Sequence, residues 1–163
     1  MKITFIAHSA FLVEWDKFYT LFDYVYEPDY TGTLPPLDPQ KPLLVFSSHS
    51  HEDHFDGKVF GLLEQYPLTQ FFVSRDTRLT ERRRKWLGIS DEAFARTTVL
   101  RPDSILLTEA AGEELSVRAI KSTDIGNAYL LRAEGKMVYH GGDLNWWHWE
   151  SEGKAYCNNI CLL

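Results

Sequence analysis

The sequence contains little cysteine: among 163 residues there are only two, Cys157 and Cys161. Two cysteines this close together cannot cross-link a fold, which excludes a disulfide scaffold of the secreted type. A reducing compartment is the natural setting for such a chain, so we expect a cytoplasmic protein. As a Cys-x-x-x-Cys pair, the two thiols are also weak candidates for a metal site.

No apolar run in the sequence approaches the length needed to span a membrane. The apolar start at residues 1–6 is followed at once by the polar residues His8, Ser9 and Glu14, a strand pattern rather than a signal peptide. Positive charge is also scarce, since 17 Lys and Arg oppose 23 Asp and Glu, giving a net charge of −6. That balance disfavours binding driven by phosphate neutralisation. We therefore expect neither a membrane nor a nucleic acid as partner.

One run departs from the acidic balance, Arg82-Arg83-Arg84-Lys85. At helical spacing, such a run is typical of a solvated helix face. The alternative is a patch that binds an anionic partner.

The chain is long enough to bury one core and too short for two comfortable domains. Its hydrophobic content of 44% and aromatic content of 14% exclude a disordered chain. We therefore expect a single folded domain over residues 1–163.

Apolar periodicity and turn residues predict a β-rich chain with a few helices. The expected strands are 2–15, 18–26, 43–48, 69–74, 97–100, 104–108, 114–121, 127–133 and 136–140. The expected helices are 56–66, 77–87 and 91–95. A proline-rich loop over 27–42 is long enough to border a site, and the turn at 134–135 predicts a hairpin. This order indicates an α/β or α+β layered domain.

The most informative segment places His49, His51, Asp53 and His54 directly after the apolar residues 43–46. His49 and His51 are two apart on an extended chain, so both can point at one metal ion. Asp53 and His54 follow as the chain turns, and can face a second ion. Imidazole and carboxylate groups suit zinc, manganese or iron. The alternative is a solvated, histidine-rich turn.

The run at 49–54 resembles the His-x-His-x-Asp-His signature of the metallo-β-lactamase fold. Further motifs follow the order of that superfamily: His-Ser at 8–9, Leu-Phe-Asp at 21–23 and Gly-Gly-Asp at 141–143. The resemblance covers essentially the whole chain, and is best with the branch that includes ascorbate-6-phosphate lactonase-like hydrolases. It implies an α/β fold: an αββα sandwich of two β-sheets with helices outside.

The resemblance also implies a dinuclear site. His49 and His51 would hold a first divalent metal ion, while Asp53 and His54 would hold a second. Asp143 would bridge the two ions, and Asp53 would also orient the nucleophile, so these two aspartates are the expected catalytic residues. Zinc is the first choice of metal, with manganese and iron as alternatives.

Three residues near the expected site have supporting or open roles. Asp23 matches a family aspartate after the second strand, and would accept a hydrogen bond that orients a ligand imidazole. His8 and His140 fall near strand ends on the same side, and either a structural or a catalytic role suits each of them.

The sequence departs from the family pattern where a third histidine is usual. Residues 122–127 contain no histidine, and Asp124 is the one strong ligand among them. We expect Asp124 to take its place, which would move the metal preference toward manganese or iron. The alternative is a turn aspartate that caps the bend at Gly126.

The second departure lies after Asp143, where the family supplies a closing histidine and further structure. The chain continues for about 20 residues, with no histidine after His148. We expect the last quarter or third of the usual domain to be missing. His148 is an alternative ligand, and the tryptophans at 146, 147 and 149 either wall a pocket or pack on the sheet.

The resulting expectation is a metal-dependent hydrolase that directs a metal-bound hydroxide at a small ester, lactone or phosphoester. The alternative is a metal-binding but inactive chain that needs a partner to complete the fold. That partner could be a second copy, which would cover apolar surface exposed at the C-terminal end.

Overall fold

The computed structural model describes residues 1–143. Its strands are β1 (Lys2–Ala7), β2 (Ala10–Glu14), β3 (Tyr19–Phe22), β4 (Leu43–Ser47), β5 (Thr69–Ser74), β6 (Thr97–Leu100), β7 (Ile105–Ala110), β8 (Glu113–Lys121), β9 (Asn127–Ala133) and β10 (Lys136–His140). Its helical elements are η1 (Gly57–Gly61), α1 (Leu62–Gln65), η2 (Arg75–Thr77), α2 (Glu81–Trp86) and α3 (Asp91–Ala95). The predicted bounds of β5, β6, β9, β10 and α3 are confirmed.

Among the other predicted elements, β7 and β8 are each one residue longer than expected, and the rest are shorter or divided. The strand predicted over 2–15 is a hairpin, because His8 has a positive φ of 45° and reverses the chain. β3 stops before Asp23 for the same reason, since that residue has φ 46°. Glycine most often takes this left-handed conformation, so His and Asp gave no turn signal in the sequence. The helix predicted over 56–66 begins as the 3-10 segment η1, whereas the one predicted over 77–87 is confined to α2, because residues 78–80 are not helical.

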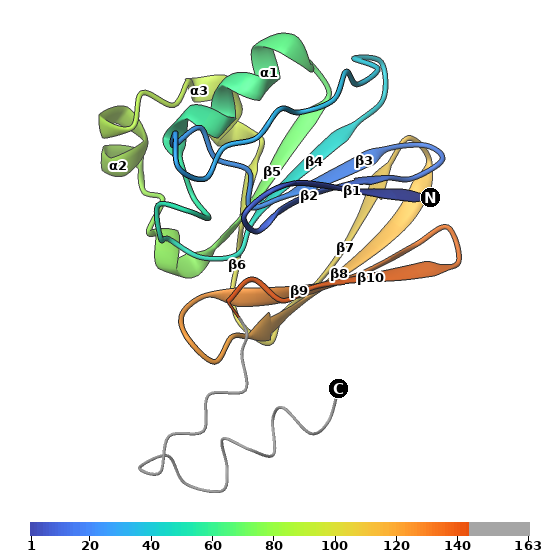
Figure 1. Cartoon of the computed structure of the whole chain (residues 1–163). Helices are drawn as coiled ribbons and strands as arrows, with labels where there is room; N and C mark the ends of the chain where they lie inside the picture. Colours follow the sequence, from blue (N-terminus) through green and yellow to red (C-terminus); the bar gives the residue numbers. More distant parts are fainter. Residues whose placement is uncertain (144–163) are drawn as a thin grey trace, which may run out of the picture.

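Two sheets face each other, in the strand orders β1-β2-β3-β4-β5-β6 and β10-β9-β8-β7. The first sheet is antiparallel from β1 to β3 and parallel from β3 to β6, whereas the second sheet is antiparallel throughout. Helices α1, α2 and α3 cover the outer face of the first sheet (Figure 1). The predicted fold class is therefore confirmed. Residues 1–143 form three of the four expected layers, which are the outer helices, the first sheet and the second sheet.

The central strand β4 contributes to both cores. Leu43 and Val45 belong to the core between the sheet and the helices, while Leu44 and Phe46 belong to the core between the two sheets. This alternation explains why the whole strand is apolar, because successive side chains point to opposite faces. Each such burial stabilises the fold by roughly 2 kcal/mol.

The parallel strands determine where polar residues gather. Asp23 follows β3, Ser48 follows β4 and Asp76 follows β5, so all three lie at the same edge of the first sheet. Loops at the carboxyl ends of parallel strands commonly form binding sites. None of the helices in the described part of the chain has the length and hydrophobicity needed to cross a membrane.

Candidate metal centre

The candidate centre begins where the fully buried strand β4 ends. In the loop that follows, His49 and His54 are buried and His51 is half exposed. The backbone N–H groups of His54 and Phe55 both donate to the carbonyl of His51, at 3.0 and 2.8 Å. This tight turn brings the His54 ring back to 4.0 Å from the His49 ring, measured between centroids.

A first group of potential ligands contains His49, His51, Asp124 and Asp143, whose ligand atoms all lie within 4.8 Å of one another. His49 Nε2 lies 3.0 Å from His51 Nδ1. His51 Nδ1 lies 3.9 Å from an Asp124 oxygen. The structure therefore brings Asp124 to the two histidines, where the sequence predicted a substitute for the missing third histidine.

A second group contains His8, Asp53 and His54, within the same 4.8 Å limit. Asp53 Oδ2 lies 3.0 Å from His8 Nε2 and 3.5 Å from His54 Nε2. The pairing of Asp53 with His54 was predicted. The role of His8 was left open, and its approach depends on the left-handed turn after β1 that the sequence did not signal.

Asp143 lies between the two groups. Its Oδ2 is 3.5 Å from His49 Nε2, and its Oδ1 is 3.1 Å from His54 Nε2. One carboxylate oxygen thus faces each group, which is the geometry of a bridging ligand.

Asp23 is the buried anchor behind the histidines. Its Oδ1 accepts from the Ser48 N–H at 2.7 Å, and its Oδ2 accepts from the Ser48 hydroxyl at 2.7 Å. Oδ2 also lies 2.8 Å from His54 Nδ1 and 2.7 Å from His140 Nε2. The predicted contact between Asp23 and a site imidazole is therefore present.

These contacts assign the protons of the imidazoles. A carboxylate only accepts, so His54 donates from Nδ1 and presents the lone pair of Nε2 to the centre. The Ser48 hydroxyl donates its hydrogen bond to Asp23. Its oxygen therefore accepts from His49 Nδ1 at 3.0 Å. His49 likewise presents a lone pair from Nε2. A single carboxylate thus orients one histidine of each group.

Burial and charge shift the pKa values in opposite directions. Burial alone would raise the pKa of the Asp23 carboxyl, but the charges and hydrogen bonds of His140 and His54 outweigh it and lower that pKa. Burial lowers the pKa of His49. Burial also acts to lower the pKa of His54, yet the hydrogen bond and charge of Asp23 with the nearby Asp143 and Asp53 raise it overall.

The environment of His54 tests whether a cation fits here. Its Nε2 is fully buried and has no hydrogen-bond partner among residues 1–143, although two carboxylates face it. A buried polar atom without a partner costs about 1–3 kcal/mol. A divalent cation would accept this lone pair and neutralise both carboxylates, so the donor set fits a metal ion.

Two glycines let the second sheet approach the centre. Gly126 has φ 75°, and a Cβ there would overlap the Ser48 carbonyl and the His49 side chain. A Cβ on Gly142 would lie 2.8 Å from the Ser48 side chain. The Asn127 N–H also donates to the Ser48 carbonyl at 2.9 Å. These close approaches bring Asp124 and Asp143 to the histidines.

Some supporting residues were not identified from the sequence. Asp76 accepts from the Ser50 N–H at 2.8 Å, which ties the histidine loop to the end of β5. The Ser48 hydroxyl connects Asp23 to His49, because it donates to Asp23 and accepts from His49 Nδ1. Neither residue belongs to a ligand-like spacing, so only the fold could indicate their roles. His140 is buried, hydrogen-bonded to Asp23 and stacked on Phe22, which supports the structural role.

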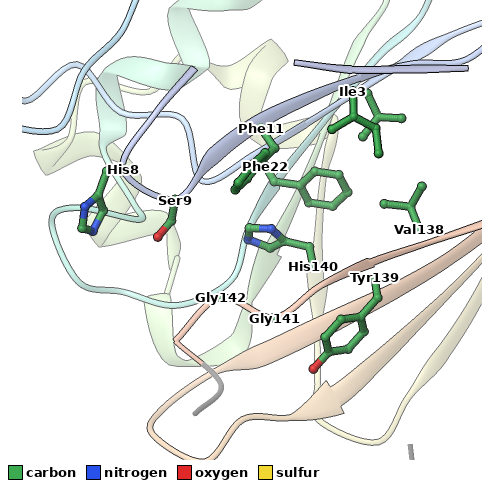
Figure 2. Close-up of a pocket in the computed structure, with 11 residues that line it drawn as sticks. Ile3, His8, Ser9, Phe11, Phe22, Val138, Tyr139, His140, Gly141 and Gly142 are labelled. Carbon is green, nitrogen blue, oxygen red and sulfur yellow. The ribbon is translucent and has the colours of Figure 1, made fainter. Parts of the chain in front are cut away.

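A cavity of about 360 Å³ opens beside the second group. Figure 2 shows His8 and Ser9 at one end of it, with His140 between them and an apolar wall. The apolar wall consists of Ile3, Phe11, Val13, Phe22 and Val138. The predicted roles of His148, of the tryptophans at 146, 147 and 149, and of Cys157 and Cys161 lie outside the described residues.

The chain is similar to known proteins along most of its length. Residues 2–154 match the family model described as the Beta-lactamase superfamily domain. The UPF0173 metal-dependent hydrolase of Opitutus terrae is 29% identical over 153 residues, which cover 88% of this chain and 63% of that protein. This chain therefore spans less than two thirds of the length of that relative.

Solved structures share the fold. Igni18, a metallo hydrolase of the archaeon Ignicoccus hospitalis, superposes with a TM-score of 0.59 at 22% identity, over 89% of this chain and 61% of that one. CmlA, a diiron β-hydroxylase of Streptomyces venezuelae, superposes with a TM-score of 0.56 at 14% identity. The match covers 87% of this chain and 29% of CmlA. At these identities the likeness shows the fold alone, and the two described activities differ.

Proposed function

The chain belongs to the beta-lactamase superfamily domain family, and on this premise we propose that it is a metal-dependent hydrolase. One observation carries the proposal: the buried Nε2 of His54 faces two carboxylates and has no hydrogen-bond partner among residues 1–143. A metal ion would provide the partner that this atom lacks.

In this proposal the two groups hold two divalent ions. His49, His51 and Asp124 hold the first ion, and Asp53 and His54 hold the second. His8 lies close enough to Asp53 to join the second set. Asp143 serves both, because each of its oxygens faces one group. Zinc is our first choice, and the three carboxylates keep manganese and iron as alternatives.

Two such ions would polarise an ester, lactone or phosphoester oxygen and supply a nucleophile from water at neutral pH. The residues of the chain would orient the reactants. Asp53 lies between the exposed His8 and the buried His54, where it could accept a proton from the nucleophile and orient it. Asp23 and Ser48 hold the lone pairs of His54 and His49 toward the centre.

The test combines elemental analysis with hydrolysis of p-nitrophenyl acetate and bis-p-nitrophenyl phosphate by protein purified without chelators. We expect up to two ions per chain, and loss of metal and hydrolysis in His51→Ala. Glu109→Gln, an exposed change on β7, is the control that should retain both. Hydrolysis that survives His51→Ala would contradict the proposal.

A second candidate function is that of a metal-binding but catalytically inactive chain that needs a partner to complete the fold. It is favoured by apolar side chains on the two outer strands: Ile3 and Phe5 on β1, and Met137 and Tyr139 on β10, are exposed. Of these, Ile3 and Tyr139 line the 360 Å³ cavity between the sheets. A second copy could cover this surface.

Sizing chromatography with metal analysis separates the two candidates. A monomer with two ions and turnover supports the hydrolase. A dimer with one ion or none, and without turnover, supports the second candidate. A cytoplasmic location remains a prediction that rests on the low cysteine content.

A further inference from the structure

The basic run at 82–85 contains two kinds of cation. Arg84 forms ion pairs with Glu81 and with Asp91, and Lys85 lies 3.8 Å from Glu81. The Lys85 side chain is 68% exposed, as expected for a solvated helix face, whereas the paired Arg84 side chain is only 11% exposed.

Arg82 and Arg83 differ, because neither has an acidic partner within residues 1–143. Arg78, which directly precedes this part of the chain in a left-handed conformation, has none either. Together with Thr80 and Trp86, these three arginines line a depression of about 550 Å³. Three arginines without an acidic partner in the described part of the chain therefore line one depression beside α2.

Arg83 gives the first sign of a ligand. Its Nε–H donor is buried and has no acceptor among the described residues. A buried donor of this kind is costly unless an acceptor completes it, more so when the group is charged. An oxyanion in the depression would provide that acceptor. Arginine suits it because its planar fork matches phosphate oxygens.

Trp86 gives the second sign. Its side chain is 79% exposed, more than any other large apolar residue of the described chain. It leaves a flat ring open beside the arginines, on the helix at the outer end of the helical layer (Figure 1). Such a ring can stack against a base or sugar, worth roughly a tenfold change in affinity or more.

We propose that Arg78, Arg82, Arg83 and Trp86 form an anion site for a small phosphorylated ligand whose ring stacks on Trp86. The volume lies within the roughly 300–1,000 Å³ typical of small-molecule sites. The net charge of −6 disfavours a nucleic-acid polymer, which needs an extended basic surface. This site is independent of the proposed hydrolase activity.

The α2 anion site also adjoins the metal centre. A second depression, of about 210 Å³, shares Arg83 and Trp86 with it and is lined by Ser50 and Glu52 at its other side. Ser50 and Glu52 alternate in sequence with His49 and His51. A ligand bound on α2 therefore lies beside the loop that carries the candidate ligands.

Isothermal titration calorimetry with adenosine monophosphate, inorganic phosphate and adenosine tests the site. We expect adenosine monophosphate to bind tightest, and Arg83→Ala or Arg82→Ala to weaken it about tenfold or more. Trp86→Ala should weaken adenosine monophosphate but leave phosphate unchanged. Arg118→Ala, which removes an exposed charge on β8, is the matched control and should change affinity less than twofold.

His51→Ala separates this site from the metal centre, because binding on α2 should survive that change. Binding lost in His51→Ala would place the anion on the metals and overturn the proposal. So would equal weakening by Arg118→Ala and Arg83→Ala, or no saturable binding at millimolar ligand. Circular dichroism of each variant shows whether α2 remains folded.

Discussion

The two groups of candidate ligands differ in how firmly the fold holds them. In the second group, His54 is completely buried and its Nδ1 is fixed by Asp23. In the first group, the side chains of His51 and Asp124 are 50% and 43% exposed. His49 is buried like His54, and His8 is 41% exposed. The groups therefore differ in their remaining members: Asp53 is 23% exposed, whereas Asp124 depends on the loop between β8 and β9.

This difference shows where the fold prepares the site before any ion arrives. Rigid, correctly oriented ligands lower the ordering cost of binding, so a preorganised group should bind more tightly. We expect the second group to retain its ion longer than the first during dialysis near pH 8. The following changes test which contacts create this difference.

The largest effect is expected from Asp23→Asn, which removes the anchor shared by both groups. The amide cannot accept from all four donors that Asp23 satisfies, so the free energy of unfolding should fall by about 3 kcal/mol. Both ions should bind at least about tenfold more weakly, because Ser48 transmits the contact to His49. Urea unfolding and elemental analysis measure the two effects.

The matched control is Asp103→Asn, the same exchange at an exposed turn with φ 61°. Asparagine also tolerates that conformation, so little change is expected. If Asp23→Asn kept both ions at full affinity, Asp23 would not be the orienting residue.

The next effect concerns Gly126, which supports only the first group. Gly126→Ala adds a Cβ that overlaps the Ser48 carbonyl at a positive φ, so we expect about 2–4 kcal/mol of destabilisation and loss of the first ion. Gly135→Ala is the control, since Gly135 has φ 66° but open space around it. It should lose only about 1 kcal/mol and no metal. If Gly126→Ala and Gly135→Ala had equal effects, the positive φ would cause the loss, and not the contact of residue 126 with Ser48 and His49.

Much of the fold follows from the sequence because its signals are local. The apolar run of β4 predicts a strand, and the Glu134-Gly135 turn marks the boundary between β9 and β10. The breaks after β1 and β3 could not be predicted, because His8 and Asp23 adopt positive φ without being glycine. Their conformations are stabilised by contacts at the centre that exist only in the folded chain.

The residues of the candidate site also fall into two sets, those that a local pattern predicts and those that only the packing of the fold brings into place. Close spacing after a buried strand identified His49, His51, Asp53 and His54, since their convergence is a property of a short segment. The approach of Asp124 and Asp143 was predicted by resemblance alone. Their positions depend on the packing of the second sheet against Ser48, which no local pattern records.

A smaller and more selective effect is expected from two isosteric changes. Asp124→Asn should weaken the first ion by about tenfold, roughly 1.4 kcal/mol, and leave the second unchanged. Asp143→Asn should weaken both ions, because its oxygens face both groups. Calorimetric titration of zinc into chelator-treated protein measures both. An Asp143→Asn variant that lost only one ion would show that Asp143 does not bridge.

The smallest effect is a difference in which ion leaves first as the pH falls. A protonated imidazole cannot bind a metal, so each ion competes with protons. The pKa of His54 is raised, because Asp23 and the nearby carboxylates outweigh burial, whereas burial lowers the pKa of His49. His54 should therefore take up a proton at a higher pH than His49, and the second group should release its ion first, although it binds more tightly near pH 8. Metal content measured at successively lower pH should fall in two steps. The step at higher pH should persist in Asp124→Asn, where only the second group binds fully. A single step, or loss of the higher one in that variant, would place the proton-sensitive ion in the first group.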